Sequence, residues 1–141
     1  MASLVYNSAK GKLIDGSIDL NTDTIKIALV TSTYTPDKDA HDFFDDITNE
    51  VVGAGYTAGG NTLGTLAVNI DNTNDRAEFD AADTSWALAT ITARGAILYK
   101  STGVASTSPL IAYIDFGENK SSSGGTFAIT FNAEGILQVG E

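Results

Sequence analysis

The stretch YTPDKDAHDFFDDITNEVVGAGYTAGG, residues 34–60, interrupts a sequence that otherwise alternates short apolar segments with turn-forming residues. It holds six acidic residues, the only histidine of the chain and four aromatic residues, and it lies between two β-rich regions. Its structure therefore decides how the strands on either side are connected.

A short helix is predicted near residues 39–47. Pro36 has the φ angle required early in a helix, and Asp37 and Asp39 suit the first turn, where carboxylates meet unpaired backbone N–H groups. The apolar residues that follow recur at the spacing of one buried helical face: Ala40, Phe43, Phe44, Ile47 and Val51. The β-branched pair at 51–52 and the glycines after it end this pattern.

The same acidic residues resemble the opening of a calcium-binding loop. Asp37, Asp39 and His41 stand at alternate positions, as in the opening of an EF-hand. The sixth position is Asp42 instead of glycine and the twelfth is Thr48 instead of glutamate, so the sharp turn and the bidentate ligand are missing. We therefore predict no metal and no cofactor, and a solvated histidine on the acidic helix.

Most of the remaining chain is predicted to form strands. The clearest central strand is TIKIALVTS, residues 24–32, and a hairpin is predicted from residues 63–71 and 76–80 because four turn formers separate them. Other extended segments are expected at residues 4–7, 12–20, 49–52, 56–58, 90–100, 110–116, 126–131 and 136–139. Asp15-Gly16 is a turn signal within the second of them.

Eight to ten short strands with frequent turns are typical of a sandwich or a barrel. We predict a single all-β domain over residues 1–141, an antiparallel β-sandwich, jelly-roll-like, with one short helix near 39–47. The predicted core is Ile25, Ile27, Leu29, Phe43, Ile47, Val68, Ile70, Phe79, Ile91, Leu98, Ile111, Tyr113, Ile114, Phe127, Ile129 and Ile136.

The amino-acid composition limits the kinds of partner and ligand that the protein can bind. The chain has 141 residues, 18 acidic and eight basic, and its net charge of −10 disfavours contact with nucleic acid or an anionic membrane surface. It has no cysteine, so disulfides and thiolate metal sites are excluded. No apolar run reaches the roughly 18 residues that span a bilayer, and no leader peptide is expected.

No arrangement of residues predicts an enzyme. The serines at 121–123 lack the spacing of a nucleophile elbow, and Asp115-Phe116-Gly117 stands without the other kinase motifs. Paired carboxylates for glycoside cleavage leave no spacing signature in sequence, so abundance of acids alone does not support them. A carbohydrate-binding module is an alternative, and exposed aromatic residues such as Tyr56 or Trp86 on one sheet face would favour it.

A family resemblance points to a biological setting. Residues 34–60, together with FDAADTSWALATITARGAILYKSTG (79–103), PLIAYIDFG (109–117) and GTFAITFNAEGIL (125–137), resemble a family of small structural proteins of tailed bacteriophages. The resemblance spans nearly the whole chain, and the first run is its most distinctive part. It implies a virion protein assembled in the bacterial cytoplasm, most plausibly a capsid decoration or cement protein, with a tail, neck or fibre component as the alternative.

The resemblance supplies no catalytic residues. It implies as partners the major capsid protein or another virion protein, and further copies of the same chain. We expect the 34–60 stretch and the termini to make these contacts, with Phe44 and Tyr34 as apolar anchors if they are exposed. The candidate interface residues are Tyr6, Tyr34, Asp37, Asp39, Phe44 and Tyr56.

Overall fold

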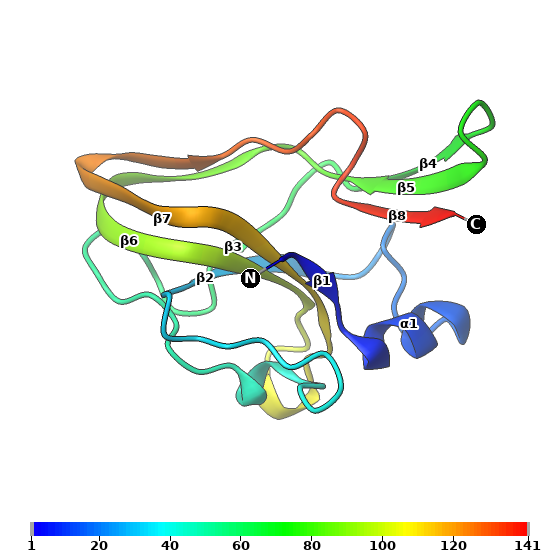
Figure 1. The fold of residues 1–141 in the computed structure, drawn as a ribbon, viewed down its shortest axis with the longest axis horizontal. Coiled ribbons are helices and arrows are strands. Elements are labelled where there is room, and N and C mark those ends of the chain that lie inside the picture. The colour runs from blue at the N-terminus through cyan, green and yellow to red at the C-terminus, as the bar shows by residue number, and fades with distance from the viewer. Residues whose placement is uncertain (1, 141) are drawn as a thin grey trace.

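The computed structural model describes residues 2–140, which form two antiparallel sheets (Figure 1). The five-stranded sheet has, in spatial order, β1 (Leu4–Val5), β7 (Leu110–Ile129), β6 (Thr84–Lys100), β2 (Ile25–Val30) and β3 (Asn61–Thr62). The three-stranded sheet has β4 (Ala67–Asp71), β5 (Arg76–Asp80) and β8 (Leu137–Gly140). The all-β, sandwich-like class is therefore confirmed, although the strands divide five and three instead of into the equal sheets of a regular jelly roll.

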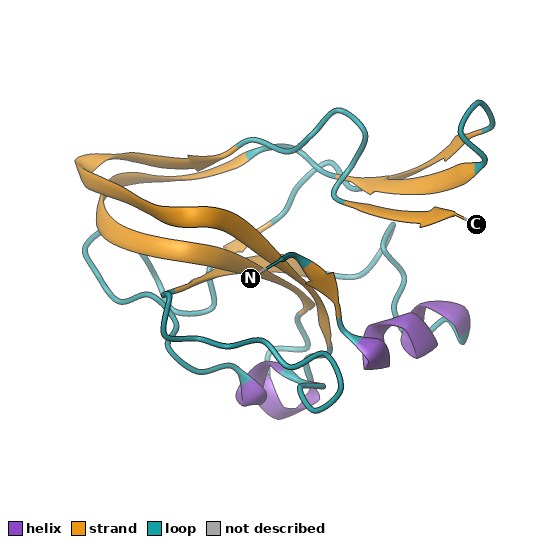
Figure 2. Ribbon diagram, viewed as in Figure 1, coloured by secondary structure: helices purple, strands orange, loops and turns teal. Residues whose placement is uncertain are grey.

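One long hairpin organises the larger sheet. β6 and β7 pair from Tyr99↔Leu110 to Thr84↔Ile129, with register shifts where the hairpin curves. Figure 2 shows that the hairpin folds back on itself, so its two halves face each other. The sequence had predicted separate short strands here, because each bend interrupts the apolar pattern.

The central strand is predicted correctly. β2 lies between β6 and β3, and its Ile25, Ile27 and Leu29 are fully buried. Ala28 and Val30 on its other face are fully buried too, because the chain packs against both faces of the sheet. This strand is the centre of the core.

The predicted core is right in the larger sheet and wrong at the end of the smaller one. The residues confirmed as buried are Ile25, Ile27, Leu29, Phe79, Ile91, Leu98, Ile111, Tyr113, Phe127 and Ile129. Phe43, Ile47, Ile114 and Ile136 are half-buried. Val68 and Ile70 are 44% and 78% exposed, because the three-stranded sheet projects from the body and only its base is covered (Figure 1).

The helix predicted near 39–47 is wrong. The region contains only η1, a single 3₁₀ turn at Phe44–Asp46. The N–H of Phe44 donates to the Ser108 carbonyl and the carbonyl of Asp42 accepts from Leu110, so this backbone pairs mainly with the chain at the start of β7. The apolar side chains that suggested a helical face are instead partly buried by packing against other parts of the chain.

The helix of the structure lies near the N-terminus. α1 spans Asn7–Ile14, where extended chain was expected, and buries Ala9. Alanine, lysine and leucine favour helix, but Gly11 in its centre weakens the sequence signal. The turn signal at Asp15-Gly16 is real: Gly16 has φ +80° and ends the helix. A second 3₁₀ turn, η2, spans Ala105–Thr107 in the hairpin loop.

The difference between the two sheets predicts different costs of truncation. Ile27→Ala removes a fully buried side chain and should lower the free energy of unfolding by about 2–5 kcal/mol. Ile70→Ala should change it by less than about 0.5 kcal/mol, because Ile70 is exposed. Urea denaturation in dilute solution, followed by the fluorescence of the single tryptophan, measures both. Equal losses would contradict the assignment of the core.

Candidate interaction surface

The segment between β2 and β3 has little regular structure, yet backbone hydrogen bonds hold it to the sheet. The N–H of Thr31 donates to Asn49 and the N–H of Val51 donates to Leu29, which closes the base of the loop. Further along, the bonds of Asp42 and Phe44 to the chain before β7 hold its middle. The acidic residues of this loop are therefore carried on a fixed frame.

Asp37 and Asp39 are exposed, as an interface requires. The Asp37 carboxylate accepts the N–H groups of Asp39 (3.0 Å) and Ala40 (3.1 Å), and these bonds lower the pKa of Asp37. The Asp39 carboxylate accepts from the side chain of Asn7 on α1 (2.5 Å). Backbone contact between Asn7 and Lys38 adds a second tie, so the helix and the acidic loop support each other.

Asp46 fixes the next turn of the loop. Its Oδ2 accepts the N–H groups of Asp42 (2.8 Å) and Phe43 (3.1 Å) at the start of η1. These backbone bonds lower the pKa of Asp46. The carboxylate thus replaces the intrahelical bonds that a longer helix would have supplied.

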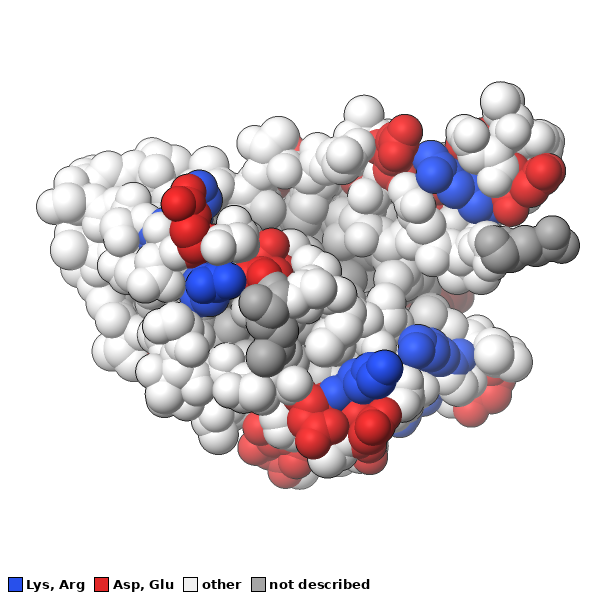
Figure 3. Space-filling model, in the orientation of Figure 1, with Lys and Arg blue, Asp and Glu red and all other residues white. Residues whose placement is uncertain are grey.

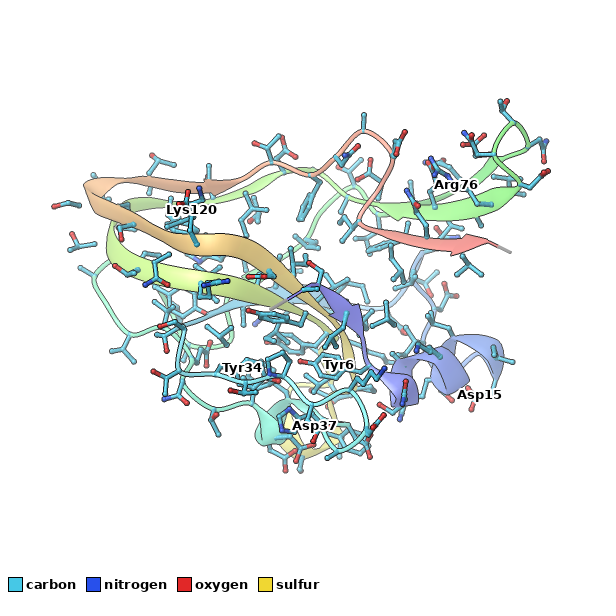
Figure 4. All side chains as sticks on the ribbon, viewed as in Figure 1. Tyr6, Asp15, Tyr34, Asp37, Arg76 and Lys120 are labelled. Carbon is cyan, nitrogen blue, oxygen red and sulfur yellow. The ribbon has the colours of Figure 1, made fainter. Side chains whose placement is uncertain are left out.

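Tyr6 and Tyr34 form a buried polar chain instead of surface anchors. They lie side by side below β1 (Figure 4), their hydroxyl oxygens are 2.8 Å apart, and they are 0% and 4% exposed. The Tyr34 hydroxyl is 2.9 Å from Nδ1 of His41, and the N–H of Asp37 donates to the same nitrogen (3.2 Å). Because a backbone N–H can only donate, Nδ1 is the acceptor, Tyr34 donates to it, and Tyr6 donates to Tyr34.

His41 is therefore a structural residue of the loop. Its ring stacks on Tyr34 with centroids 5.7 Å apart, and it is half-buried. The prediction of a solvated histidine on an acidic helix is wrong on both points. Its contacts with Tyr34 and Asp37 have no periodic signature in the sequence.

The other two candidate residues also face inward. Phe44 is half-buried and stacks on Tyr99 at 4.2 Å. The Tyr56 hydroxyl accepts the N–H of Leu29 (2.9 Å) and donates to Glu50 (2.7 Å). Glu50 also accepts the N–H of Gly59 (2.6 Å), so this carboxylate, which sequence reasoning had not singled out, ties the end of the loop together.

The aromatic residues give no sugar-binding platform. Within residues 2–140 no tyrosine, phenylalanine or tryptophan side chain is exposed, and the exposed large apolar residues are all aliphatic. Trp86 is 4% exposed and packs near Tyr56 and Phe127. The feature that would favour a carbohydrate-binding module is thus missing from the described surface.

Among the described residues, no group of histidine and carboxylate side chains is arranged to hold a metal ion. No described helix has the length and apolar character needed to cross a bilayer. No protein-family model matches the chain, and neither a curated protein nor a solved structure matches it.

Tyr6, Tyr34, Tyr56 and Tyr99 are predicted to stay protonated until the protein unfolds. Burial raises the pKa of Tyr34 and Tyr99 to about 12 and raises the pKa of Tyr6, Tyr56 and Tyr113 as well. Unfolded tyrosine ionises near pH 10, so the folded state holds more protons above that pH and the free energy of unfolding falls as pH rises. Absorbance at 295 nm should therefore rise together with loss of circular dichroism. Phenolate formation near pH 10 in folded protein would contradict this.

Asp46→Asn should destabilise the protein by about 1 kcal/mol at neutral pH, because the charged acceptor of two N–H groups is lost. The lowered pKa means that Asp46 stabilises the fold above about pH 4 and stops doing so as pH falls. The difference between variant and parent should therefore shrink in acid. Denaturation curves at several pH values measure it, with exposed Asp45→Asn as the control. If the difference in the free energy of unfolding did not change with pH, the loss would not come from the charge of Asp46, and this prediction would be contradicted.

Proposed function

We propose that this protein is a non-enzymatic structural protein of a tailed-bacteriophage virion that decorates or cements the capsid. The observation that carries the proposal is the acidic loop, in which backbone N–H groups hold the carboxylates of Asp37 and Asp46 and the side chain of Asn7 on α1 holds that of Asp39. It coincides with the most distinctive part of the resemblance to phage structural proteins. A loop ordered in advance binds with a smaller loss of conformational entropy.

The charge of the loop indicates the kind of partner surface. Asp37, Asp39 and Asp45 are exposed on it, and Figure 3 shows acidic residues gathered along this lower edge of the molecule beside the lysines of α1. Such a surface fits a basic or mixed-charge partner and increases the association rate more than the affinity. The apolar anchors expected here are not available, since Tyr34 is buried and Phe44 is covered in part by Tyr99. Polar contacts would therefore dominate this interface.

The location in the virion is tested by copy number. Quantitative mass spectrometry of purified particles should find this protein in copies comparable to the capsid protein, on the order of hundreds for a closed symmetric shell. Copies in single or low double digits would refute capsid decoration and favour the tail or neck alternative. Absence from particles would overturn the virion assignment.

The contact surface is tested by paired triple variants with equal net charge. Asp37, Asp39 and Asp45 changed to Asn should slow binding to shells that lack this protein and make binding less sensitive to salt. The control changes Asp15, Asp19 and Asp75 to Asn, three exposed carboxylates elsewhere. Equal slowing by both triples would show that net charge, not the loop, determines association.

A further inference from the structure

The three-stranded sheet has one charged face that is satisfied within the chain. Arg76 on β5 contacts the carboxylates of Asp71 (3.5 Å), Glu78 (2.8 Å) and Glu134 (3.6 Å). Its Nη1 also donates to the side-chain oxygen of Gln138 on β8 (3.3 Å). Arg76 is labelled on the outer side of this sheet in Figure 4. This face needs no further partner.

The opposite face is apolar and only half covered. Directly paired residues share a face, and the pairs form two rows, Val68–Phe79–Leu137 and Ile70–Ala77–Val139. Phe79 and Leu137 at the base are 2% and 8% exposed, whereas Val68, Ile70 and Val139 are 44%, 78% and 64% exposed. A sheet face of this kind is stable in water only to the extent that something covers it. We name Val68, Ile70 and Val139 the aliphatic tip.

An apolar cleft begins where the aliphatic tip ends. It has a volume of about 830 Å³ and lies between the folded-back halves of β7, the short strand β1 and β8. Its lining includes Leu4, Ile114, Phe116, Phe131, Ile136 and Leu137. Leu137 lines the cleft and lies on the same face of β8 as Val139 of the aliphatic tip, so the cleft and the tip are neighbours on this face.

Carboxylates are absent from the described residues of this surface although the chain is strongly acidic. None of the described residues that line the cleft is a carboxylate, and its one charged residue, Lys120, is paired with Glu118. The aliphatic tip carries no charge either. Figure 3 shows the result: a hollow, largely uncoloured area between the charged end of the three-stranded sheet and the charged residues over α1.

We infer that the aliphatic tip and the cleft form a self-association surface. In the resulting dimer, the tip of each copy enters the cleft of the other. Two copies with a net charge of −10 each repel one another least where carboxylates are missing, and the described residues of the tip and cleft include none. One chain also carries both the tip and the cleft next to each other on β8, so a two-fold symmetric contact can pair the tip of each copy with the cleft of the other.

The first test is the oligomeric state in solution. Sedimentation equilibrium between about 1 μM and about 1 mM should show a monomer–dimer equilibrium for the parent chain. Ile70→Asp with Val139→Asp should weaken dimerisation by about ten-fold or more, because charges would be buried at the contact. Val52→Asp with Val104→Asp, two exposed aliphatic positions elsewhere, should leave it unchanged. Circular dichroism verifies folding of each variant.

The second test separates insertion into the cleft from simple contact of two sheets. Ala128 is exposed and lines the cleft, so Ala128→Arg should obstruct it without removing a buried side chain. The Asp tip variant and the Arg cleft variant should each be monomeric alone and should associate when mixed, since the mixture restores one intact contact and pairs opposite charges in the other. A parent chain that stays monomeric, a dimer broken by the Val52 control variant, or a mixture without association would each overturn the inference.

The outcome is independent of the proposed place in the virion. Dimerisation is measured on the purified chain, whereas the virion assignment is measured on particles. A monomer found in high copy on capsids would refute the self-association surface alone, and a dimer absent from particles would refute the virion assignment alone.

Discussion

The pairing of β6 with β7 is the constraint on which the rest of the structure depends. This hairpin supplies the two longest strands, and its curvature brings Trp86 and Phe127 over the half that carries Phe116. At Gly95, beside one of the register shifts, β7 packs so closely that a Cβ atom would lie 2.5 Å from the ring of Tyr113 and 2.7 Å from the carbonyl oxygen of Ile114. Glycine is the one residue that fits this approach, so the fold of the hairpin and the identity of residue 95 are linked.

The acidic loop depends on the same sheet. Gly60, with φ +72°, passes so close to β2 that a Cβ atom would lie 1.8 Å from the carbonyl oxygen of Ile27. From this contact back to Thr31, the loop uses Glu50, Asp46 and Asp37 as acceptors of backbone N–H groups. From composition alone these carboxylates would be expected only to face solvent. In the structure they also accept backbone N–H groups that a helix or sheet would otherwise satisfy, and so they keep the loop ordered.

The sequence predicted the strands whose apolar residues alternate with a period of two. It missed the features that depend on contacts between residues far apart in the chain. Alternation in residues 24–32 identified β2, and turn formers at 72–75 identified the β4–β5 hairpin. The 39–47 helix failed because the backbone of Asp42 and Phe44 pairs with Leu110 and Ser108 and because Phe44 packs on Tyr99. Tyr6 and Tyr34 were misplaced because their contact spans 28 residues. Val68 and Ile70 alternate as a buried face does, and no local signal shows that half of that face lies beyond the body of the molecule.

The separation of charged and apolar surfaces explains how one small acidic chain could take part in an assembly. Exposed carboxylates on the acidic loop would repel a second copy approaching from that side, but the aliphatic tip and cleft lie elsewhere and carry no unpaired charge. Repulsion at one surface then favours contact at the other, so the net charge of −10 would select the orientation of self-association while the loop stays free for a basic partner. A chain with its acids spread evenly would lose both effects, because every approach of two copies would bring like charges together.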